Sequence, residues 1–389
     1  MKTAIPNAKH RKVLRRWKNV KIVLVVPGGF DRSGSERVIP ALLWLTERLA
    51  RHNEVHVCVM DGADAPASYP LAGAQVHVLG QVAAGLPGTR ALRLWRPLLR
   101  TLASIGRPDV IHGFWAGASG VLAGLAGRKL GVPAVLSIGG GELIWLPEIS
   151  YGGRGSWRGR AQAGLALRLA RAVTAGSHYA ARPLHRRYGV QIVPLGVDMP
   201  SFVAPVERPA GPPWRLLHVA SINRVKDPPT LLRTLRLIVD QEPDVQLDWV
   251  GEDTLGGAMQ RLCGELGLAQ HVTFHGFRPS QAAAPLYRAA HLHLLASRHE
   301  SQAVVVGEAA AAGLPTVGTI VGVVAELAPA AAWAVPVGDA AALAAGALAL
   351  LRDPARREQL GRAAQAWARA HDADWTATQF EAIYEQVKG

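Results

Sequence analysis

Short apolar runs alternate with amphipathic stretches along most of the chain, and this alternation predicts strands that alternate with helices. The runs are of the continuous kind that suits strands buried on both faces of a parallel sheet. They lie at 22–26, 55–60, 76–79, 134–138, 172–177, 216–219, 245–250, 272–277 and 291–295. Apolar positions at helical spacing follow at 36–51, 90–104, 230–239 and 375–387. The pattern predicts α/β architecture with parallel sheets.

A Pro-rich run divides this pattern into two halves, and the 389 residues are enough for two domains of ordinary size. We predict five segments from the pattern and the composition. They are a basic arm at 1–20, a Rossmann-like domain at 21–203, a linker at 204–213, a second Rossmann-like domain at 214–372 and a final helix at 373–389.

Positive charge is concentrated in the first half. The chain has a formal net charge of +14, yet residues 1–200 alone hold 27 Lys and Arg against 10 Asp and Glu. This asymmetry predicts an anionic partner, which can be a lipid head group, a phosphorylated acceptor or a nucleic acid. No helix-turn-helix, RNP or zinc-finger pattern is present, so we expect no nucleic-acid partner.

Cysteine usage and apolar length bear on the compartment. Cys58 and Cys263 lie far apart without metal-ligand spacing, and Cys58 sits within an apolar run, which favours buried free thiols. The run 22–26 is too short for a signal peptide, and no apolar stretch reaches the length of a membrane span. We therefore expect a cytoplasmic protein, which could attach peripherally to the inner face of the plasma membrane.

Two glutamates bracket the start of a helix in the second half. Glu300 follows the strand 291–295, and an Ala-rich helix that should stop at Gly313 carries Glu308. The backbone N–H groups at such a helix start can bind a phosphate, and carboxylates accept hydrogen bonds from sugar hydroxyls. The stretch therefore predicts a pocket for a sugar joined to a diphosphate. In the alternative interpretation, Glu308 is an ordinary glutamate stabilised by the helix dipole and Glu300 is a solvated loop residue.

Other loops that follow strands carry candidate ligand contacts. Arg224 and Lys226 lie after the strand 216–219 and would suit a diphosphate. In the first half, Gly34 and Glu142 follow predicted strands, and His112 lies in a predicted strand at 109–115 that ends in a loop. Ligands of open parallel sheets bind at such carboxyl ends. An isolated histidine is more often structural, and two exposed cations on a loop are the alternative for Arg224 and Lys226.

The chain resembles the retaining glycosyltransferases of family 4 over roughly residues 20–389. The resemblance rests on Ser297, on the spacing from Glu300 to Glu308 with its Gly and Pro downstream, and on Gly34-Ser-Glu-Arg37. It implies the GT-B fold, in which two Rossmann-like domains with parallel sheets face each other across a cleft and the last helix returns to the first domain. It also implies a nucleoside-diphosphate sugar as donor, with no resident cofactor and no metal.

The resemblance implies a role for each candidate residue. Glu308 would hold the donor ribose, Glu300 would lie near the donor sugar, and Arg224 and Lys226 would neutralise the leaving diphosphate. His112 would lie on the acceptor side. The remaining donor contacts would come from Gly34, Gly276, Phe277, Ser301, Gln302, Ala303 and Val304.

The chain departs from the family pattern at three of these loops. Many members have a histidine followed by glycine where this chain has Gly139, so a backbone group, Glu142 or His112 would have to supply that contact. Ser301 and Asp227 stand where the family commonly has glycine.

Basic residues beside aromatic ones predict a second contact surface. Arg154 and Arg158 flank Trp157 in a Gly-rich stretch that we expect to be a mobile loop, and the predicted helix 90–104 aligns Arg93, Arg96 and Arg100 on one face. With the arm at 1–20, these could grip an anionic acceptor or a membrane surface. Solvated faces are the alternative interpretation.

The expected function is transfer of a sugar, with retention, to a lipid-linked or cell-surface glycan acceptor, as in polysaccharide, lipopolysaccharide or glycolipid biosynthesis. A sugar-nucleotide epimerase of the same fold and a catalytically inactive relative that only binds sugar nucleotides are the alternatives.

Overall fold

The computed structural model describes residues 19–62, 66–80, 90–184, 187–203, 208 and 211–389. The predicted arm at 1–20 and the predicted linker at 204–213 thus lie largely outside the described residues. Contacts divide the chain into two compact units. Unit 1 comprises the described residues up to Gly176 with Ala181–Leu195 and Ala373–Gly389, and unit 2 comprises Ser177–Ala180 and Gly196–Asp372.

Unit 1 is built on one eight-stranded sheet with the strand order β3-β4-β2-β1-β5-β6-β7-β8. All neighbouring pairs are parallel except β3 and β4, which form an antiparallel edge. The strands are β1 (Lys21–Val26), β2 (Glu54–Val59), β3 (Ser68–Leu71), β4 (Ala74–Val78), β5 (Val110–Phe114), β6 (Ala134–Ile138), β7 (Ala172–Ala175) and β8 (Val190–Ile192).

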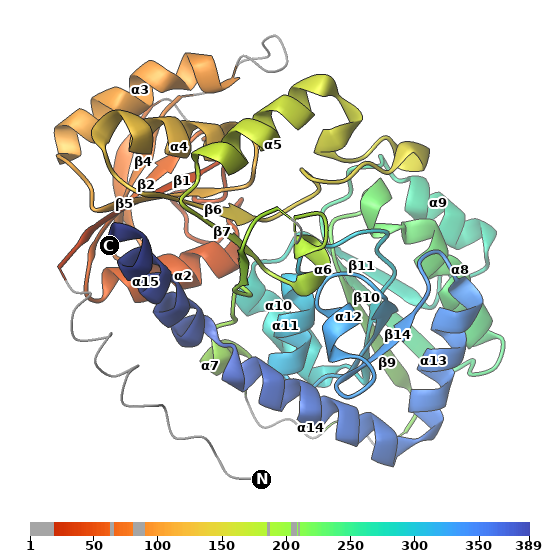
Figure 1. The fold of residues 1–389 in the computed structure, drawn as a ribbon. Coiled ribbons are helices and arrows are strands. Elements are labelled where there is room, and N and C mark those ends of the chain that lie inside the picture. Colours follow the sequence, from red (N-terminus) through yellow and green to blue (C-terminus); the bar gives the residue numbers. More distant parts are fainter. Residues whose placement is uncertain (1–18, 63–65, 81–89, 185–186, 204–207, 209–210) are drawn as a thin grey trace. The chain divides into compact units, whose positions relative to one another are not determined.

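Alternate residues of β1 enter two different cores. Ile22, Leu24 and Val26 pack with α2 (Pro40–Ala50) and α15 (Ala373–Lys388), whereas Val23 and Val25 pack with α3 (Arg90–Ile105) and α4 (Ala118–Leu130). Successive side chains of a strand point to opposite faces, so helices cover both faces of the sheet. Figure 1 shows α3, α4 and α5 (Trp157–Leu169) side by side in orange to yellow-green, and α15 in dark blue beside α2.

Unit 2 has one parallel six-stranded sheet with the order β11-β10-β9-β12-β13-β14. Its strands are β9 (Trp214–Val219), β10 (Val245–Val250), β11 (Val272–Gly276), β12 (Leu292–Leu295), β13 (Thr316–Thr319) and β14 (Ala332–Val335). Its helices are α7 (Met199–Phe202), α8 (Pro228–Val239), α9 (Ala258–Glu265), α10 (Ser280–Ala289), α11 (Val304–Ala311), α12 (Val324–Leu327), α13 (Ala340–Arg352) and α14 (Pro354–Ala370).

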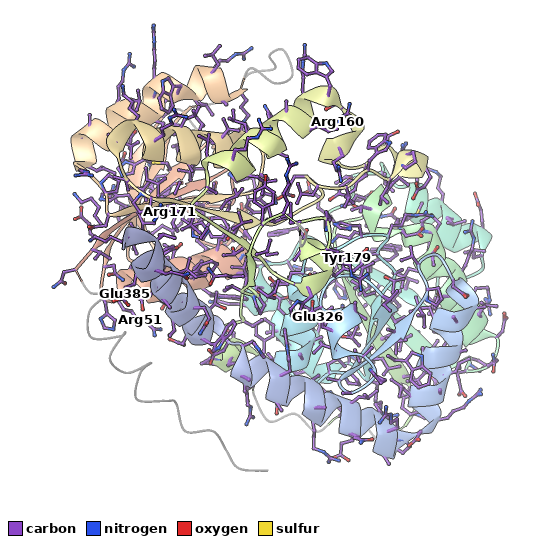
Figure 2. The ribbon with its side chains drawn as sticks, viewed as in Figure 1. Arg51, Arg160, Arg171, Tyr179, Glu326 and Glu385 are labelled. Atoms are coloured by element: carbon purple, nitrogen blue, oxygen red, sulfur yellow. The ribbon has the colours of Figure 1, made fainter. Side chains whose placement is uncertain are left out.

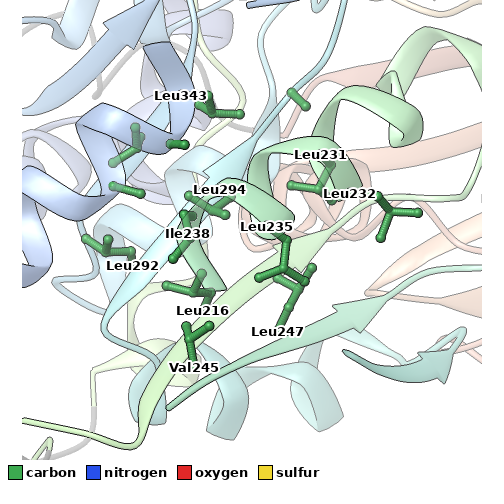
Figure 3. Packing of buried hydrophobic residues seen from close by; sticks show 14 of the residues in the cluster. Leu216, Leu231, Leu232, Leu235, Ile238, Val245, Leu247, Leu292, Leu294 and Leu343 are labelled. Carbon is green, nitrogen blue, oxygen red and sulfur yellow. The ribbon is translucent and has the colours of Figure 1, made fainter. Parts of the chain in front are cut away.

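The core of unit 2 follows from its helical periodicity. The buried face of α8 presents Leu231, Leu235 and Ile238 at intervals of three and four residues, and these pack on Leu216 of β9 and Leu247 of β10 (Figure 3). The prediction of two α/β units with parallel sheets is therefore confirmed.

Short 3-10 turns and one short helix complete the assignment: η1 (Pro147–Ile149), η2 (Gly153–Gly155), η3 (Arg224–Lys226) and α6 (His178–Ala181). Two predicted elements differ from the structure. The helix expected from residue 36 begins at Pro40, because Arg37 has a φ of 47° and the proline suits the first helical position. The expected mobile loop 151–160 instead contains the start of α5, where Ser156 Oγ accepts a hydrogen bond from Gly159 N.

Within the described part of the chain, none of the helices is both long and apolar enough to cross a bilayer.

Candidate functional site: two sets of loops at strand ends

In unit 2, β9 and β12 are neighbours in the middle of the sheet, and the strands that follow each of them are added toward opposite edges. The segment 214–276 builds β9, β10 and β11 in one direction, and 292–335 builds β12, β13 and β14 in the other. In open parallel sheets, ligands bind outside the carboxyl ends of the strands at such a switch point. The loop after β9 carries Arg224 and Lys226, and the loop after β12 carries Glu300. The structure thus brings the predicted cations and the first glutamate to one edge of the sheet.

Lys226 and Glu300 contact each other directly. The Lys226 Nζ atom donates to Glu300 Oε1 at 2.5 Å, and Ser297 Oγ donates to the same oxygen at 2.7 Å. The side chain of Lys226 is 22% exposed and that of Glu300 is 11% exposed. A nearly buried carboxylate is therefore matched by one ammonium group and one hydroxyl. This pair joins the two loops at the edge where the sequence predicts a diphosphate.

A second ion pair ties the same two loops together. Asp227 has a left-handed backbone with a φ of 48°, and its carboxylate lies 3.1 Å from Arg298 Nε. Glycine reaches this conformation without strain, and Asp is among the side chains that tolerate it. The geometry explains how Asp227 can occupy a position where the family commonly has glycine. Arg224 is exposed and makes no ion pair within the described residues.

Glu308 lies on α11 and is held by two hydroxyl groups. Tyr287 Oη donates to Glu308 Oε2 at 2.6 Å, and Ser280 Oγ donates to Oε1 at 3.1 Å. Burial raises the pKa of Glu308 to about 6, although both hydrogen bonds oppose this rise. Burial and the neighbouring carboxylate also raise the pKa of Tyr287, so its hydroxyl stays a donor. Above pH 6 the site therefore presents a buried anion that can accept hydroxyl hydrogen bonds.

The turn into α11 has a strained residue. Ala303 has a φ of 69°, in the left-handed region that favours glycine, and it directly precedes Val304 at the helix start. Ser301 and Gln302 are buried, and the carbonyl oxygen of Gln302 accepts from Val323 N at 2.9 Å. Val306 N donates to Ala303 O at 2.9 Å, whereas the amides of Val304 and Val305 begin the helix, where backbone N–H groups can bind an anion.

Gly276 and Phe277 end the edge strand β11 at the same carboxyl edge of the sheet. Gly276 has a φ of 65° and is exposed, and the Phe277 side chain is 49% exposed. An exposed aromatic ring and an open backbone at this position suit the flat face of a nucleobase.

In unit 1, two cavities lie at the carboxyl ends of strands. The larger, of about 490 Å³, is formed by the loops after β1 and β2, and the smaller, of about 420 Å³, by those after β5 and β6. Pro27, Arg90 and Trp115 line both cavities. Between β1 and β5 the strand order reverses, so this edge is the ligand-binding crevice expected for a parallel sheet. Gly34, with a φ of 67°, lies in the loop that follows β1.

His112 does not reach these cavities. Its Nδ1 atom lies 2.7 Å from Tyr384 Oη and its Nε2 atom 2.8 Å from Ser137 Oγ, and its ring stacks on Phe114. Complete burial lowers the pKa of His112 to about 3. The expectation that His112 contacts the acceptor does not fit this position, because both ring nitrogens are used to join β5, β6 and α15. The structural alternative fits instead.

Glu142 does line the smaller cavity, together with Tyr151. Its Oε1 atom accepts from Ala116 N at 3.2 Å and from Gly139 N at 3.0 Å, so the carboxylate joins the loops after β5 and β6. Arg90 and Trp115 were not predicted as site residues. Their positions at the start of a helix and directly after a strand are the only signals that could have marked them.

The predicted contacts Arg154 and Arg158 do not line either cavity. Both are exposed, and the Arg158 guanidinium lies 5.4 Å from the centre of the Trp157 ring. They belong to an outer surface of unit 1, where Figure 2 labels the neighbouring Arg160.

A further cavity of about 490 Å³ in unit 2 lies away from the switch point. It is lined by Arg208, Arg357 and residues at the amino ends of β12 and β13. Arg208 caps two helix ends there, because it donates to the carbonyl oxygens of Arg288, in the last turn of α10, and of Ala312 and Gly313, which follow α11. This cavity is therefore separate from the candidate donor site.

Comparison with known proteins agrees with this fold. The family described as glycosyl transferases group 1 matches residues 204–367, and glycosyltransferase family 4 matches residues 34–199. The structure is similar to a sucrose-phosphate synthase from Thermosynechococcus elongatus, with a TM-score of 0.79 at 20% identity, covering 95% of this chain and 99% of that one. It is also similar to Anabaena Alr3699/HepE in complex with UDP-glucose, with a TM-score of 0.71 at 18% identity, covering 95% and 100%.

Curated relatives match over shorter stretches. A D-inositol 3-phosphate glycosyltransferase of Corynebacterium jeikeium is 33% identical over 150 residues, 34% of this chain and 36% of that protein. A phosphatidyl-myo-inositol mannosyltransferase of Mycobacterium tuberculosis is 33% identical over 212 residues, 51% of this chain and 54% of that protein. The chain thus spans between about a third and a little over half the length of these relatives. The two family matches, one in each unit, and the paired parallel-sheet units identify the chain as a family 4 glycosyltransferase with the GT-B fold.

Proposed function

We propose that the protein transfers a sugar from a nucleoside-diphosphate sugar to an acceptor, with the donor held by unit 2. The observation that carries this proposal is the cluster at the β9–β12 switch point, where Lys226 pairs with Glu300 at 2.5 Å beside exposed Arg224. The diphosphate would lie against these cations and the first amides of α11. Glu308 would accept hydrogen bonds from the ribose, and Phe277 would contact the base.

The proposed reaction proceeds with retention. The bond from the anomeric carbon to the diphosphate oxygen breaks, and the acceptor oxygen bonds to that carbon on the same face. The acceptor proton passes to the departing diphosphate oxygen, so a protein base is unnecessary. Lys226, Arg224 and the amides of α11 stabilise the negative charge that develops on the diphosphate, which is the role a metal ion would otherwise have.

We propose that the acceptor is a polyol ring that bears a phosphate, either free or lipid-linked. Arg32, Arg37 and Arg90 line the larger cavity of unit 1, and guanidinium groups bind phosphate through paired hydrogen bonds. Asp61 pairs with Arg90 at 3.0 Å, and Asp31 lies 4.0 Å from Arg37, which is largely exposed. The two relatives named above act on D-inositol 3-phosphate and phosphatidyl-myo-inositol by name, and this chemistry matches the cavity.

One assay separates this function from its rivals. We expect one member of a panel of uridine, guanosine and adenosine diphosphate sugars to raise the melting temperature in a thermal-shift assay. The protein should then transfer the sugar from that donor to D-inositol 3-phosphate, and NMR should show that the product has the same anomeric configuration as the donor. An epimerase would convert the donor without acceptor, and an inactive relative would bind it without turnover. Failure of every donor to bind would overturn the donor site.

We further propose that an outer surface of unit 1 attaches to an anionic membrane from the cytoplasmic side. The helix α3 exposes Arg93, Arg96 and Arg100, with Leu92 76% exposed beside them. Helix α5 lies beside α4 on the same side of the sheet (Figure 1), and its Trp157 is 68% exposed. Cations next to exposed Trp and Leu side chains are the composition of an interfacial surface.

Replacement of Arg93, Arg96 and Arg100 with glutamine should weaken binding to vesicles that contain phosphatidylglycerol. Each arginine near an anionic surface is worth about 1 kcal/mol, so the partition coefficient should fall about hundredfold. Co-sedimentation at low and high salt measures this effect. The matched control replaces Arg233, Arg261 and Arg369, which are exposed in unit 2. Equal loss in both triple variants, or no binding by the wild type at low salt, would contradict membrane attachment.

A further inference from the structure

Trp115 is a backbone outlier at the ligand-binding edge of unit 1. It follows β5 directly and has a φ of 68°, which is rare for a residue with a bulky side chain. The conformation is held on both sides, because Trp115 N donates to Ser137 O at 2.8 Å and Gly120 N donates to Trp115 O at 3.2 Å. Such outliers persist only where the surrounding structure enforces them, and they are concentrated at functional sites.

Glu142 supplies part of this enforcement. One of its oxygens accepts from the amide after Trp115, that of Ala116, and from the amide of Gly139 on the adjoining loop. The other oxygen is buried and has no hydrogen-bond partner among the described residues. Glu142 therefore positions the Trp115 loop and keeps one oxygen that can accept a hydroxyl from a ligand.

The glycines after β6 leave space for the indole ring. A Cβ atom on Gly139 would lie 2.9 Å from Trp115 Cε2, and one on Gly140 would lie 3.0 Å from Trp115 Nε1. The Gly139 distance is shorter than real Cβ contacts, so a side chain at Gly139 would require the ring of Trp115 to shift from its present position. The side chain that the family often has at position 139 is thus replaced, in space, by an aromatic ring from the neighbouring loop.

The ring is half-buried and lines both cavities of unit 1, so it separates the charged cavity of Arg32 and Arg37 from that of Glu142 and Tyr151. Part of Trp115 packs against the core of unit 1, and the residue also lines the two cavities. An apolar indole face between hydrogen-bonding groups matches a cyclic polyol, which has apolar C–H faces and polar edges.

We propose that Trp115 is the surface on which the ring of the acceptor packs, and that it sets acceptor specificity in place of a side chain at Gly139. The phosphate of the acceptor then lies toward Arg90 and the larger cavity, and a ring hydroxyl lies toward Glu142. This inference rests on the proposed function and names a residue that the sequence did not mark.

The test compares Trp115→Ala, Trp115→Gly and Trp115→Phe in transfer from the bound donor to D-inositol 3-phosphate, with direct binding of the same probe by calorimetry. Loss of the apolar face should raise the KM and Kd for the probe about tenfold or more in the Ala and Gly variants. The KM for the donor should stay within about twofold, and phenylalanine should restore most of the affinity.

Two further variants separate binding from folding. Because glycine accepts a φ of 68°, Trp115→Gly should melt ~2–4 °C above Trp115→Ala while losing the probe equally. Glu142→Ala should weaken probe binding. Glu142→Gln should restore the loop position but only part of the affinity, since its one amide oxygen can accept from both backbone amides while an NH2 group takes the place of the oxygen that would accept from the ligand. Trp367→Ala, on α14 of unit 2, is the matched tryptophan control.

The outcomes distinguish the inference from the proposed function. Wild-type KM for the probe in Trp115→Ala, or equal losses for donor and probe, would overturn the role of Trp115. A wild-type protein that binds donor but neither binds nor glycosylates D-inositol 3-phosphate would also overturn it, and would leave the donor site standing. A wild type that binds no donor removes the proposed function itself.

Discussion

Replacement of Lys226 and Arg224 with alanine should slow sugar transfer by orders of magnitude while leaving both units folded. Each group that stabilises developing charge in a transition state typically contributes a factor of about 100 to 1,000 in kcat. Arg224 is exposed and Lys226 is held in place by Glu300, so in the proposed function both cations would stabilise the leaving diphosphate. Single-turnover measurements of sugar transfer would give the effect on the chemical step.

The pairing with Glu300 provides the control for this experiment. Lys226→Ala alone leaves a carboxylate that is 11% exposed without its cation, which should lower the free energy of unfolding by about 2 kcal/mol. This is less than the loss for a fully buried pair, because the Lys226 side chain is partly in water. Adding Glu300→Gln should recover stability but not activity. A change in kcat of less than about threefold in the double alanine variant would refute the diphosphate clamp.

Replacement of Glu308 with glutamine should stabilise the free protein and weaken donor binding at the same time. The pKa of Glu308 rises from 4.5 to about 6 on folding, so its ionisation opposes folding. The penalty is absent below pH 4.5, grows between pH 4.5 and 6 and is complete above pH 6, at about 2 kcal/mol. Glu308→Gln should therefore raise stability by up to this amount at pH 7.5 and by little at pH 4, which denaturant titrations at both pH values would measure.

Donor affinity should move in the opposite direction. A hydrogen bond to a charged acceptor is worth about 1.5–3 kcal/mol, so Glu308→Gln should raise the Kd of the preferred nucleoside diphosphate by roughly ten- to a hundredfold. The wild type should also lose affinity as pH falls through about 6, and the variant should lack this additional dependence. Removal of the ribose hydroxyls from the ligand should weaken binding to the wild type only. Identical Kd values for both proteins would remove Glu308 from the donor site.

Local sequence patterns predicted much of the fold, because each strand or helix is a property of a few neighbouring residues. The strand 245–250 matches β10 at both ends. The helix that carries Glu308 ends before Gly313 as predicted, and Gly313 has a left-handed φ of 63°. The start of α2 was missed because the turn at Arg37 depends on a positive φ in a residue that seldom adopts it. The start of α5 was missed because a Gly-rich, basic stretch favours a loop, and the cap at Ser156 overrode that preference.

The candidate donor site was also accessible from the sequence, since Arg224, Lys226, Glu300 and Glu308 all follow strands of a parallel sheet, and the topology brings such loops to one edge. The acceptor side was not accessible in the same way. The position of His112 near a strand end favoured a ligand contact, but in the structure both of its ring nitrogens bind Ser137 and Tyr384.

The sequence by itself determined the order of the elements, the faces that become buried and the edge of each sheet where chemistry can occur, because periodicity and strand order are enough for these. Only the tertiary structure decided which groups meet there. It paired Lys226 with Glu300 across 74 residues, joined His112 to Tyr384 across 272, and placed Trp115 in the space beside Gly139. These contacts depend on distances of a few ångströms between segments remote in the chain, and no local pattern encodes such distances.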